Sequence, residues 1–154
     1  MLKQISKYII LSYCFCVQAH AFTCYITMVK DSCWKDYNLI VRVSDASTNA
    51  ESTTITVPAG KLWERQEFEC KEKQTLALVA QFNPVFWSGD ENKTFPAQRY
   101  WKLPDNIESG ITGWNVTVCF PKWFADVPLP PHATADCKCD MDSIPPIPPV
   151  QSKN

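Results

Sequence analysis

The stretch "FTCYITMVK", residues 22 to 30, predicts the fold class of this chain through its alternating side chains. Phe22, Cys24, Ile26 and Met28 fall on one face of an extended segment. A period of two is expected of a strand that buries one face. Alternation or enrichment in β-branched residues recurs in "DYNLIVRVSDA", "ESTTITVPAG", "QTLALVAQFNP" and "GWNVTVCFP".

These strands are separated by segments with turn chemistry, such as "DASTN", "PAG" and "SGDEN". The segment "KLWERQEFEC" contains good helix formers, but its weak alternation favours a strand. Six or seven short strands at regular spacing are typical of an antiparallel sandwich or a barrel. The prediction is an all-β, disulfide-stapled antiparallel β-sandwich with a proline-rich C-terminal tail.

Residues 1–21 read as a secretory signal peptide. Lys3 and Lys7 precede an apolar run from Tyr8 to Val17, and Ala19-His20-Ala21 forms a small-x-small cleavage pattern. The run is too short to span a bilayer, and no later segment is a transmembrane candidate. A lipoprotein signal needs a small residue before its cysteine, which neither Cys14 nor Cys16 has. The expected location is the periplasm, with outer-membrane association or secretion as variants.

The charge balance argues against nucleic acid as a partner. The chain has 15 Lys and Arg against 16 Asp and Glu, and removal of Lys3 and Lys7 with the signal leaves 13 basic residues. There is no basic block, which phosphate binding requires.

Six cysteines remain after residues 1–21 are removed: Cys24, Cys33, Cys70, Cys119, Cys137 and Cys139. An even number in an exported chain predicts three disulfides, and the sequence leaves their pairing open. Zinc is the competing use, but the chain has no CxxC pair and only His132 outside residues 1–21. No metal and no cofactor are expected.

Proline content divides the chain into a domain, residues 22–124, and a tail, residues 125–154. Eight of the twelve prolines lie from Pro121 onward. Proline donates no ladder hydrogen bond, so this segment favours an extended polyproline II conformation. Cys137 and Cys139 are expected to fasten the tail to the domain, which leaves a segment free to dock on a partner: Ile144, Pro145, Pro146, Ile147, Pro148, Pro149 and Val150.

The Cys137–Cys139 pair also admits a redox interpretation. A disulfide between them closes a small, strained and therefore labile ring. However, Asp136, Asp140 and Asp142 surround the pair, and a reactive thiol needs a positive environment. The same acids suggest calcium, but the spacing and glycine of an EF-hand loop are absent.

Trp87 and Trp101 flank turn-rich segments and are candidates for a glycan platform or a protein hot spot. The alternative is that both rings fill a small core. Hydrolytic catalysis has little support, because His132 lies in the proline-rich tail and no nucleophile elbow or phosphate loop is present. The protein is predicted not to be an enzyme.

Three stretches, "CYITMVKDSCW", "ALVAQFNPVFW" and "WNVTVCFP", are followed by the CxC pair and the proline tail. In these features the chain resembles small cysteine-rich periplasmic proteins that serve as accessory subunits of bacterial secretion-type envelope complexes. The resemblance implies a structural role and transfers no functional residue.

The expected function is that of an exported, non-enzymatic adaptor subunit of such an assembly, docking through its surface and tail. The first alternative is a secreted carbohydrate- or receptor-binding module that uses the exposed tryptophans. The second is a thiol-disulfide active protein that uses the CxC pair.

Overall fold

A computed structural model describes residues 22–85, 87–133 and 136–149, so the predicted signal peptide and Val150 lie outside the described residues. The all-β prediction is confirmed, because the regular elements of this part are strands and one short 3₁₀ helix. In chain order they are β1 (Phe22–Lys30), η1 (Ser32–Trp34), β2 (Leu39–Asp45), β3 (Glu51–Val57), β4 (Trp63–Cys70), β5 (Thr75–Phe82), β6 (Phe95–Pro96), β7 (Trp101–Lys102) and β8 (Trp114–Phe120).

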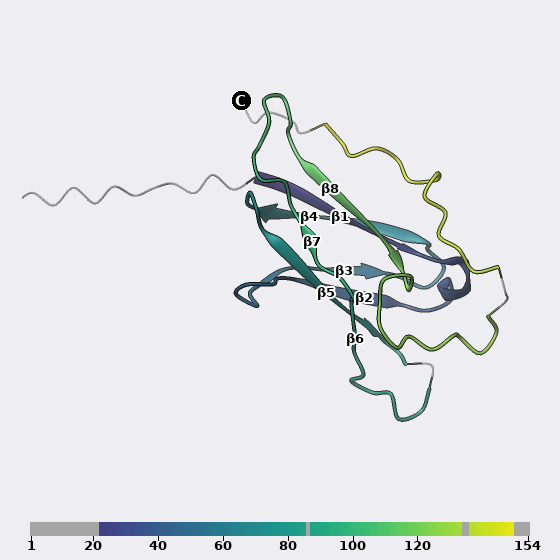
Figure 1. The fold of residues 1–154 in the computed structure, drawn as a ribbon. Helices are drawn as coiled ribbons and strands as arrows, with labels where there is room; N and C mark the ends of the chain where they lie inside the picture. The colour runs from purple at the N-terminus through teal and green to yellow at the C-terminus, as the bar shows by residue number, and fades with distance from the viewer. Residues whose placement is uncertain (1–21, 86, 134–135, 150–154) are drawn as a thin grey trace, which may run out of the picture.

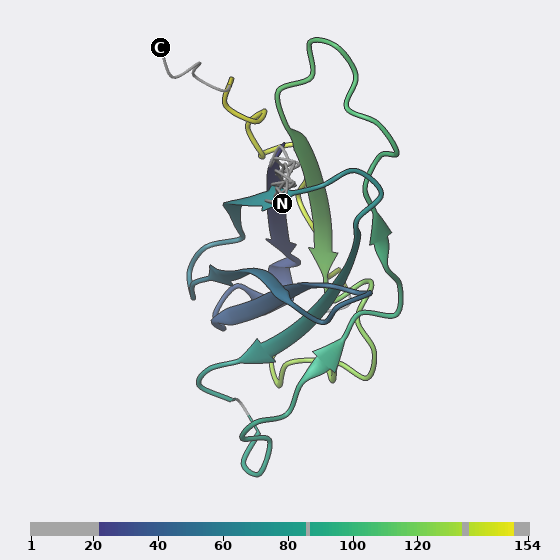
Figure 2. The ribbon, with the colours of Figure 1, turned by 90° about the vertical axis from the view of Figure 1, so that its left-hand side faces the viewer.

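The strands form two sheets that lie one above the other (Figures 1 and 2). The first sheet has three strands in the order β4-β1-β8. The second sheet has the order β3-β2-β5-β6, with β7 also paired to β5. The segment "KLWERQEFEC" is indeed a strand, β4, which pairs with β1 along its length.

The prediction of a purely antiparallel arrangement is wrong. β8 runs parallel to β1, from Cys24 opposite Trp114 to Lys30 opposite Phe120. These are the first and last strands, and the chain between them passes through the whole second sheet, so no hairpin constrains their direction. Alternation of side chains carries no information on strand direction, which is why the sequence did not reveal this pair.

The core lies between the two sheets and takes buried side chains from both. Trp34 of η1 is fully buried there. Its ring stacks on Phe82 at a centroid distance of 4.6 Å and meets Phe120 edge-on at 5.4 Å. The alternating faces of the strands supply the rest, including Leu39, Val41, Val43, Leu76, Leu78 and Ala80.

Lys30 fixes the end of β1. Its side chain is fully buried, and Nζ donates to the carbonyl oxygens of Lys35, Tyr37 and Pro58 at 3.2, 2.6 and 2.9 Å. Burial lowers the pKa of Lys30 to about 8, and the charge of Asp36 opposes this shift. The ammonium group therefore ties three loop carbonyls to one strand end, because its three donors match three acceptors.

The three predicted disulfides are present. Cys24 pairs with Cys70, Cys33 with Cys137, and Cys119 with Cys139. The first bridge joins β1 to β4 within the first sheet, and the other two join the tail to η1 and to β8. The redox interpretation of the CxC pair is not supported, because Cys137 and Cys139 each bond to a different distant cysteine.

Candidate functional site

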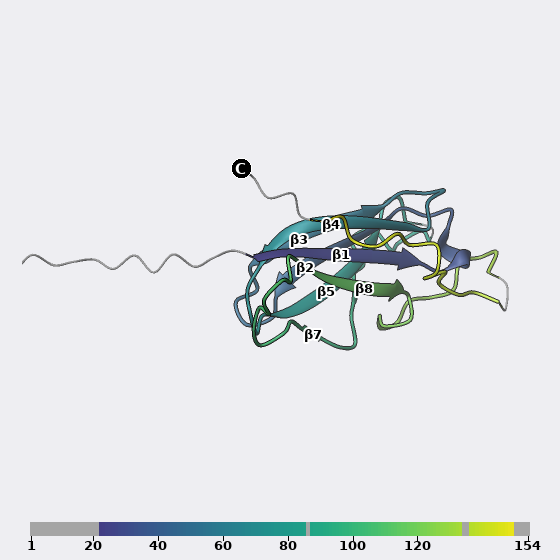
Figure 3. The ribbon, with the colours of Figure 1, turned by 90° about the horizontal axis from the view of Figure 1, so that it is seen from above.

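The tail crosses the outer surface of the first sheet (Figures 1 and 3). We call this surface, together with residues 136–149, the tail face. Two disulfides hold the first residues of this segment, with Cα–Cα distances of 5.3 Å for Cys33–Cys137 and 5.9 Å for Cys119–Cys139. Between them the backbone N–H of Ser32 donates to the carbonyl of Lys138 at 3.1 Å. The start of the tail is therefore held by covalent and hydrogen bonds together.

β1 is buried on both faces beneath the tail. Its outward residues Tyr25, Thr27 and Val29 are 7%, 0% and 0% exposed, although Ile26 and Met28 already fill the core side. The Sγ atom of Cys139 lies 3.4 Å from the carbonyl oxygen of Val29. The alternation predicted one buried face for this strand. β1 has two buried faces, because the core covers one face and the tail and neighbouring side chains cover the other.

A row of polar side chains runs across the three strands of the tail face. Arg65 Nε donates to Thr27 Oγ1 at 2.9 Å, and Thr27 Oγ1 donates to Asn115 Oδ1 at 2.9 Å. Asn115 Nδ2 in turn donates to Thr117 Oγ1 at 3.0 Å. The register places Thr27 directly between Arg65 on β4 and Thr117 on β8, so strand pairing itself aligns the row.

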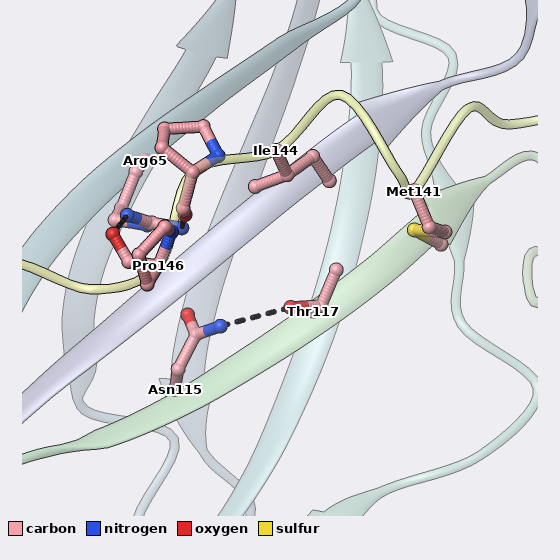
Figure 4. A pocket seen from close by; sticks show the side chains of 7 residues that line it. Arg65, Asn115, Thr117, Met141, Ile144 and Pro146 are labelled. Atoms are coloured by element: carbon pink, nitrogen blue, oxygen red, sulfur yellow. Dashed lines mark hydrogen bonds between the residues drawn. The ribbon is translucent and has the colours of Figure 1, made fainter.

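Arg65 also holds the tail. Its Nη1 and Nη2 atoms donate to the carbonyl oxygens of Pro146 and Pro145 at 3.0 and 2.7 Å (Figure 4). A proline-rich extended segment makes no internal hydrogen bonds, so its carbonyls need outside donors. The planar fork of a guanidinium supplies several donors in a fixed geometry. Arg65 thus joins the polar row of the sheet to the proline segment.

An open hollow of about 390 Å³ remains between the tail and the sheet. Arg65, Asn115 and Thr117 form its floor, and Ile144 and Met141 come from the tail (Figure 4). Met141 is 42% exposed at its margin. The site combines apolar tail side chains with a satisfied polar row, an arrangement suited to binding.

The predicted docking residues lie along the tail face and do not extend away from it into solvent. Pro145 and Pro146 contact Arg65, and Ile144 and Ile147 are half-buried, whereas Pro148 and Pro149 are exposed. The prolines of this segment give no sign of an intramolecular partner, which is why the sequence predicts a segment free to dock. Arg65, Thr27 and Asn115 were missed, since one arginine among the acids of β4 carries no sequence signal for a tail contact.

Trp87 and Trp101 lie away from the tail face. Trp101 is on β7, which pairs with the start of β5, whereas Trp87 is in the loop that leaves the end of β5. Trp87 is 46% exposed. The guanidinium carbon of Arg99 lies 5.1 Å from the ring centroids of both Trp101 and Trp123. Trp87 and Trp101 therefore do not form one binding platform. Arg99, the cation beside Trp101, also lies beside the ring of Trp123.

Within the described residues, Asp31, Cys33 and Cys137 form a cluster of side chains of metal-binding type. Both sulfur atoms belong to one disulfide, so they offer no thiolate. Burial raises the pKa of Asp31, while backbone N–H groups of Cys33 and Trp34 oppose the shift. Asp31 caps η1 by accepting from Cys33 N at 2.9 Å, which is a structural role.

Among the described residues there is no helix with the length and apolar character needed to cross a membrane. No protein-family model, curated protein or solved structure matches this chain.

Proposed function

We propose that the protein is an exported, non-enzymatic adaptor subunit of a bacterial envelope assembly, and that it binds a protein partner through the tail face. The observation that carries this proposal is the bond of Arg65 to the carbonyls of Pro145 and Pro146. It holds a proline segment in one conformation on a disulfide-anchored surface.

A prearranged segment of this kind is suited to recognition. Ordering a flexible chain opposes binding, and here folding of the domain has already ordered the segment. Pro145, Pro146, Pro148 and Pro149 are exposed, with Met141 close to the hollow. Extended proline ridges dock into aromatic-lined grooves, so the partner proposed is a protein with such a groove.

The disulfides support an extracytoplasmic location. Structural disulfides persist in oxidising compartments and are rare in the cytosol. Two of the three bridges fasten the proposed binding segment, so reduction would release the surface on which the proposal depends. Export is also what the signal-peptide prediction for residues 1–21 implies.

The test is affinity purification of the tagged protein from gently solubilised envelopes, with native sizing and identification of what is recovered. We expect stoichiometric recovery in a large complex for the wild type. Recovery should be lost on deletion of residues 143–154 and reduced in Arg65→Ala. Arg42→Ala, on the outer face of the second sheet, is the matched control and should leave recovery unchanged. Undiminished recovery after the deletion would show that the tail is not the docking element.

A second candidate function is binding of an acidic carbohydrate, favoured by the position of Arg99 between two tryptophans. Lys122 Nζ also lies 4.9 Å from the Trp123 ring centroid, so two cations gather on one ring. Within the described residues no ion pair joins Arg99 or Lys122 to a carboxylate. Tryptophan rings bind the apolar faces of sugars, and a cation beside them selects for a carboxylate.

Tryptophan fluorescence distinguishes acidic-carbohydrate binding from the adaptor function. Titration with uronic-acid oligosaccharides should shift the emission of the wild type but not of Arg99→Gln, whereas neutral oligosaccharides should have no effect. Absence of a shift with the acidic glycans would remove this candidate and leave the adaptor proposal intact.

A further inference from the structure

β8 is an edge strand without the features that normally block edge pairing. It pairs with β1 on one side only, and this pairing runs from Trp114 to Phe120 with no bulge. Its sequence, "WNVTVCF", contains no charged residue and no proline. An edge presents a row of unpaired backbone N–H and C=O groups, and most proteins protect such rows with charges, prolines, bulges or covering segments.

The other edges have such protection. β4 carries Glu64, Arg65, Glu67 and Glu69. β3 carries Glu51, and its register against β2 shifts at Ser44. β7 is two residues long. The segment after β8 covers β6, because Ala97 bridges Phe124 and Ala125 N donates to the Pro96 carbonyl at 2.9 Å. The bare edge of β8 is therefore a specific feature of this sheet.

The geometry of the parallel pair shows which backbone groups face outward. Asp31 N donates to the carbonyl of Phe120 at 2.9 Å, so the backbone of Phe120 points toward β1. The direction of the backbone groups alternates along a strand. The N–H and C=O groups of Val116 and Val118 therefore face β1, as those of Phe120 do. The outward N–H and C=O groups consequently belong to Asn115, Thr117 and Cys119.

The sequence of β8 is nearly symmetric about Thr117. Val116 and Val118 flank it, Asn115 and Cys119 follow, and the aromatic residues Trp114 and Phe120 close the strand. An antiparallel copy centred on Thr117 sets Val116 against Val118 and Trp114 against Phe120. β-branched, Thr–Thr and aromatic cross-strand pairs are the favourable ones, and no like charges meet.

We propose that two copies of this chain pair antiparallel through their β8 edges, about a twofold axis at Thr117. In this register each outward residue meets another outward residue: Thr117 meets Thr117, and Asn115 meets Cys119. Every outward N–H and C=O group then has a partner in the second copy, as in an isologous interface. A shift of one residue would set outward groups against inward ones, so the alternation of the backbone excludes it.

Among the described residues, no other segment makes a backbone hydrogen bond to Asn115, Thr117 or Cys119. The tail is fastened to β8 by the Cys119–Cys139 disulfide and then crosses the outer face of β1 toward Arg65 on β4 (Figure 3). The polar row that begins at Arg65 ends at Thr117, next to the proposed axis. Pairing therefore continues that row into the second copy and leaves the tail of each copy exposed.

Cysteine cross-linking of the full, oxidised protein tests the register. The Cα atoms of paired Thr117 residues would lie about 5.5 Å apart, within the range of a disulfide. Thr117→Cys should therefore give a covalent dimer under mild oxidation. Asn115→Cys is the matched control, because the two Asn115 residues would be roughly 13 Å apart and should not cross-link. Equal cross-linking of both variants, or none with Thr117→Cys, would overturn the proposal.

Native mass gives a second test without added cysteines. Sedimentation of the wild type at about 100 μM should show a dimer. This concentration is above the Kd expected of an interface as small as one pair of strands. Thr117→Pro removes an outward N–H and no bond to β1, so it should give a folded monomer. Thr56→Pro on β3 is the control and should stay dimeric. A monomeric wild type at this concentration would refute the dimer.

Discussion

The guanidinium of Arg65 donates a 2.7 Å hydrogen bond to the carbonyl of Pro145, which lies 80 residues further along the chain. The same side chain donates to Thr27 on the neighbouring strand. Arg65 thus joins the sheet to the tail in addition to the Cys119–Cys139 disulfide on β8 and the Cys33–Cys137 disulfide on η1. This contact turns a segment that cannot form a sheet ladder into part of the folded surface.

Arg65→Ala should loosen the tail without unfolding the domain. The variant loses two charge-assisted bonds to the tail, and we expect the free energy of unfolding to fall by about 1–2 kcal/mol. Hydrogen exchange at the Ile144 amide, which donates to the Met141 carbonyl at 3.4 Å, should become faster because the segment lifts from the sheet. Arg65→Lys should be intermediate, since a lysine lacks the planar fork. Unchanged exchange in Arg65→Ala would show that the disulfides alone position the tail.

The two tail disulfides should differ in their effect on stability. Cys33 and Cys137 are 104 residues apart, whereas Cys119 and Cys139 are 20 apart. Closing the longer loop restricts the unfolded chain more, even though the other bridges shorten its path. Replacing both cysteines by alanine should therefore cost about 1 kcal/mol more for Cys33–Cys137. Chemical denaturation of the two double variants measures this, and the reverse order would contradict the entropic explanation.

Lys30 should make stability depend on alkaline pH. Its pKa is about 8 in the folded protein and 10.5 in the unfolded reference. Between these values the unfolded chain binds more protons, so the contribution of this group to stability rises as pH increases from 8 to 10.5. The gain is at most about 3 kcal/mol.

The measurement is the free energy of unfolding against pH for the wild type, Lys30→Met and Lys30→Arg. Neither variant titrates in this range, so both should lack the rise that Lys30 gives the wild type. Identical slopes in all three proteins would mean that the Lys30 ammonium is not destabilised by burial.

Trp34 should be the most sensitive single position in the core. It is fully buried and stacks on Phe82, so Trp34→Ala removes a large ring and leaves a cavity. The expected loss of stability is about 3–5 kcal/mol. Tyr100, which is 65% exposed, serves as the control, and Tyr100→Ala should change stability by less than about 0.5 kcal/mol. Thermal and urea unfolding compare the two, and equal losses would contradict this description of the core.

Much of this protein was accessible from local sequence patterns. The alternation of apolar residues in β2 and β5 matches the alternation of buried residues in the structure, because side-chain direction in a strand depends only on residue parity. The even number of cysteines predicted three disulfides, since unpaired thiols are disfavoured in an oxidising compartment. Proline content marked the C-terminal segment, whose described residues form no regular element.

Other features depend on contacts between distant parts of the chain. The parallel pairing of β1 with β8, the partners of Cys137 and Cys139, and the hydrogen bond from Arg65 to Pro145 join residues that are 20 to 104 positions apart. No local pattern encodes them, because a residue's propensity does not name its partner. They arise when two sheets close on one core and bring these groups within bonding distance.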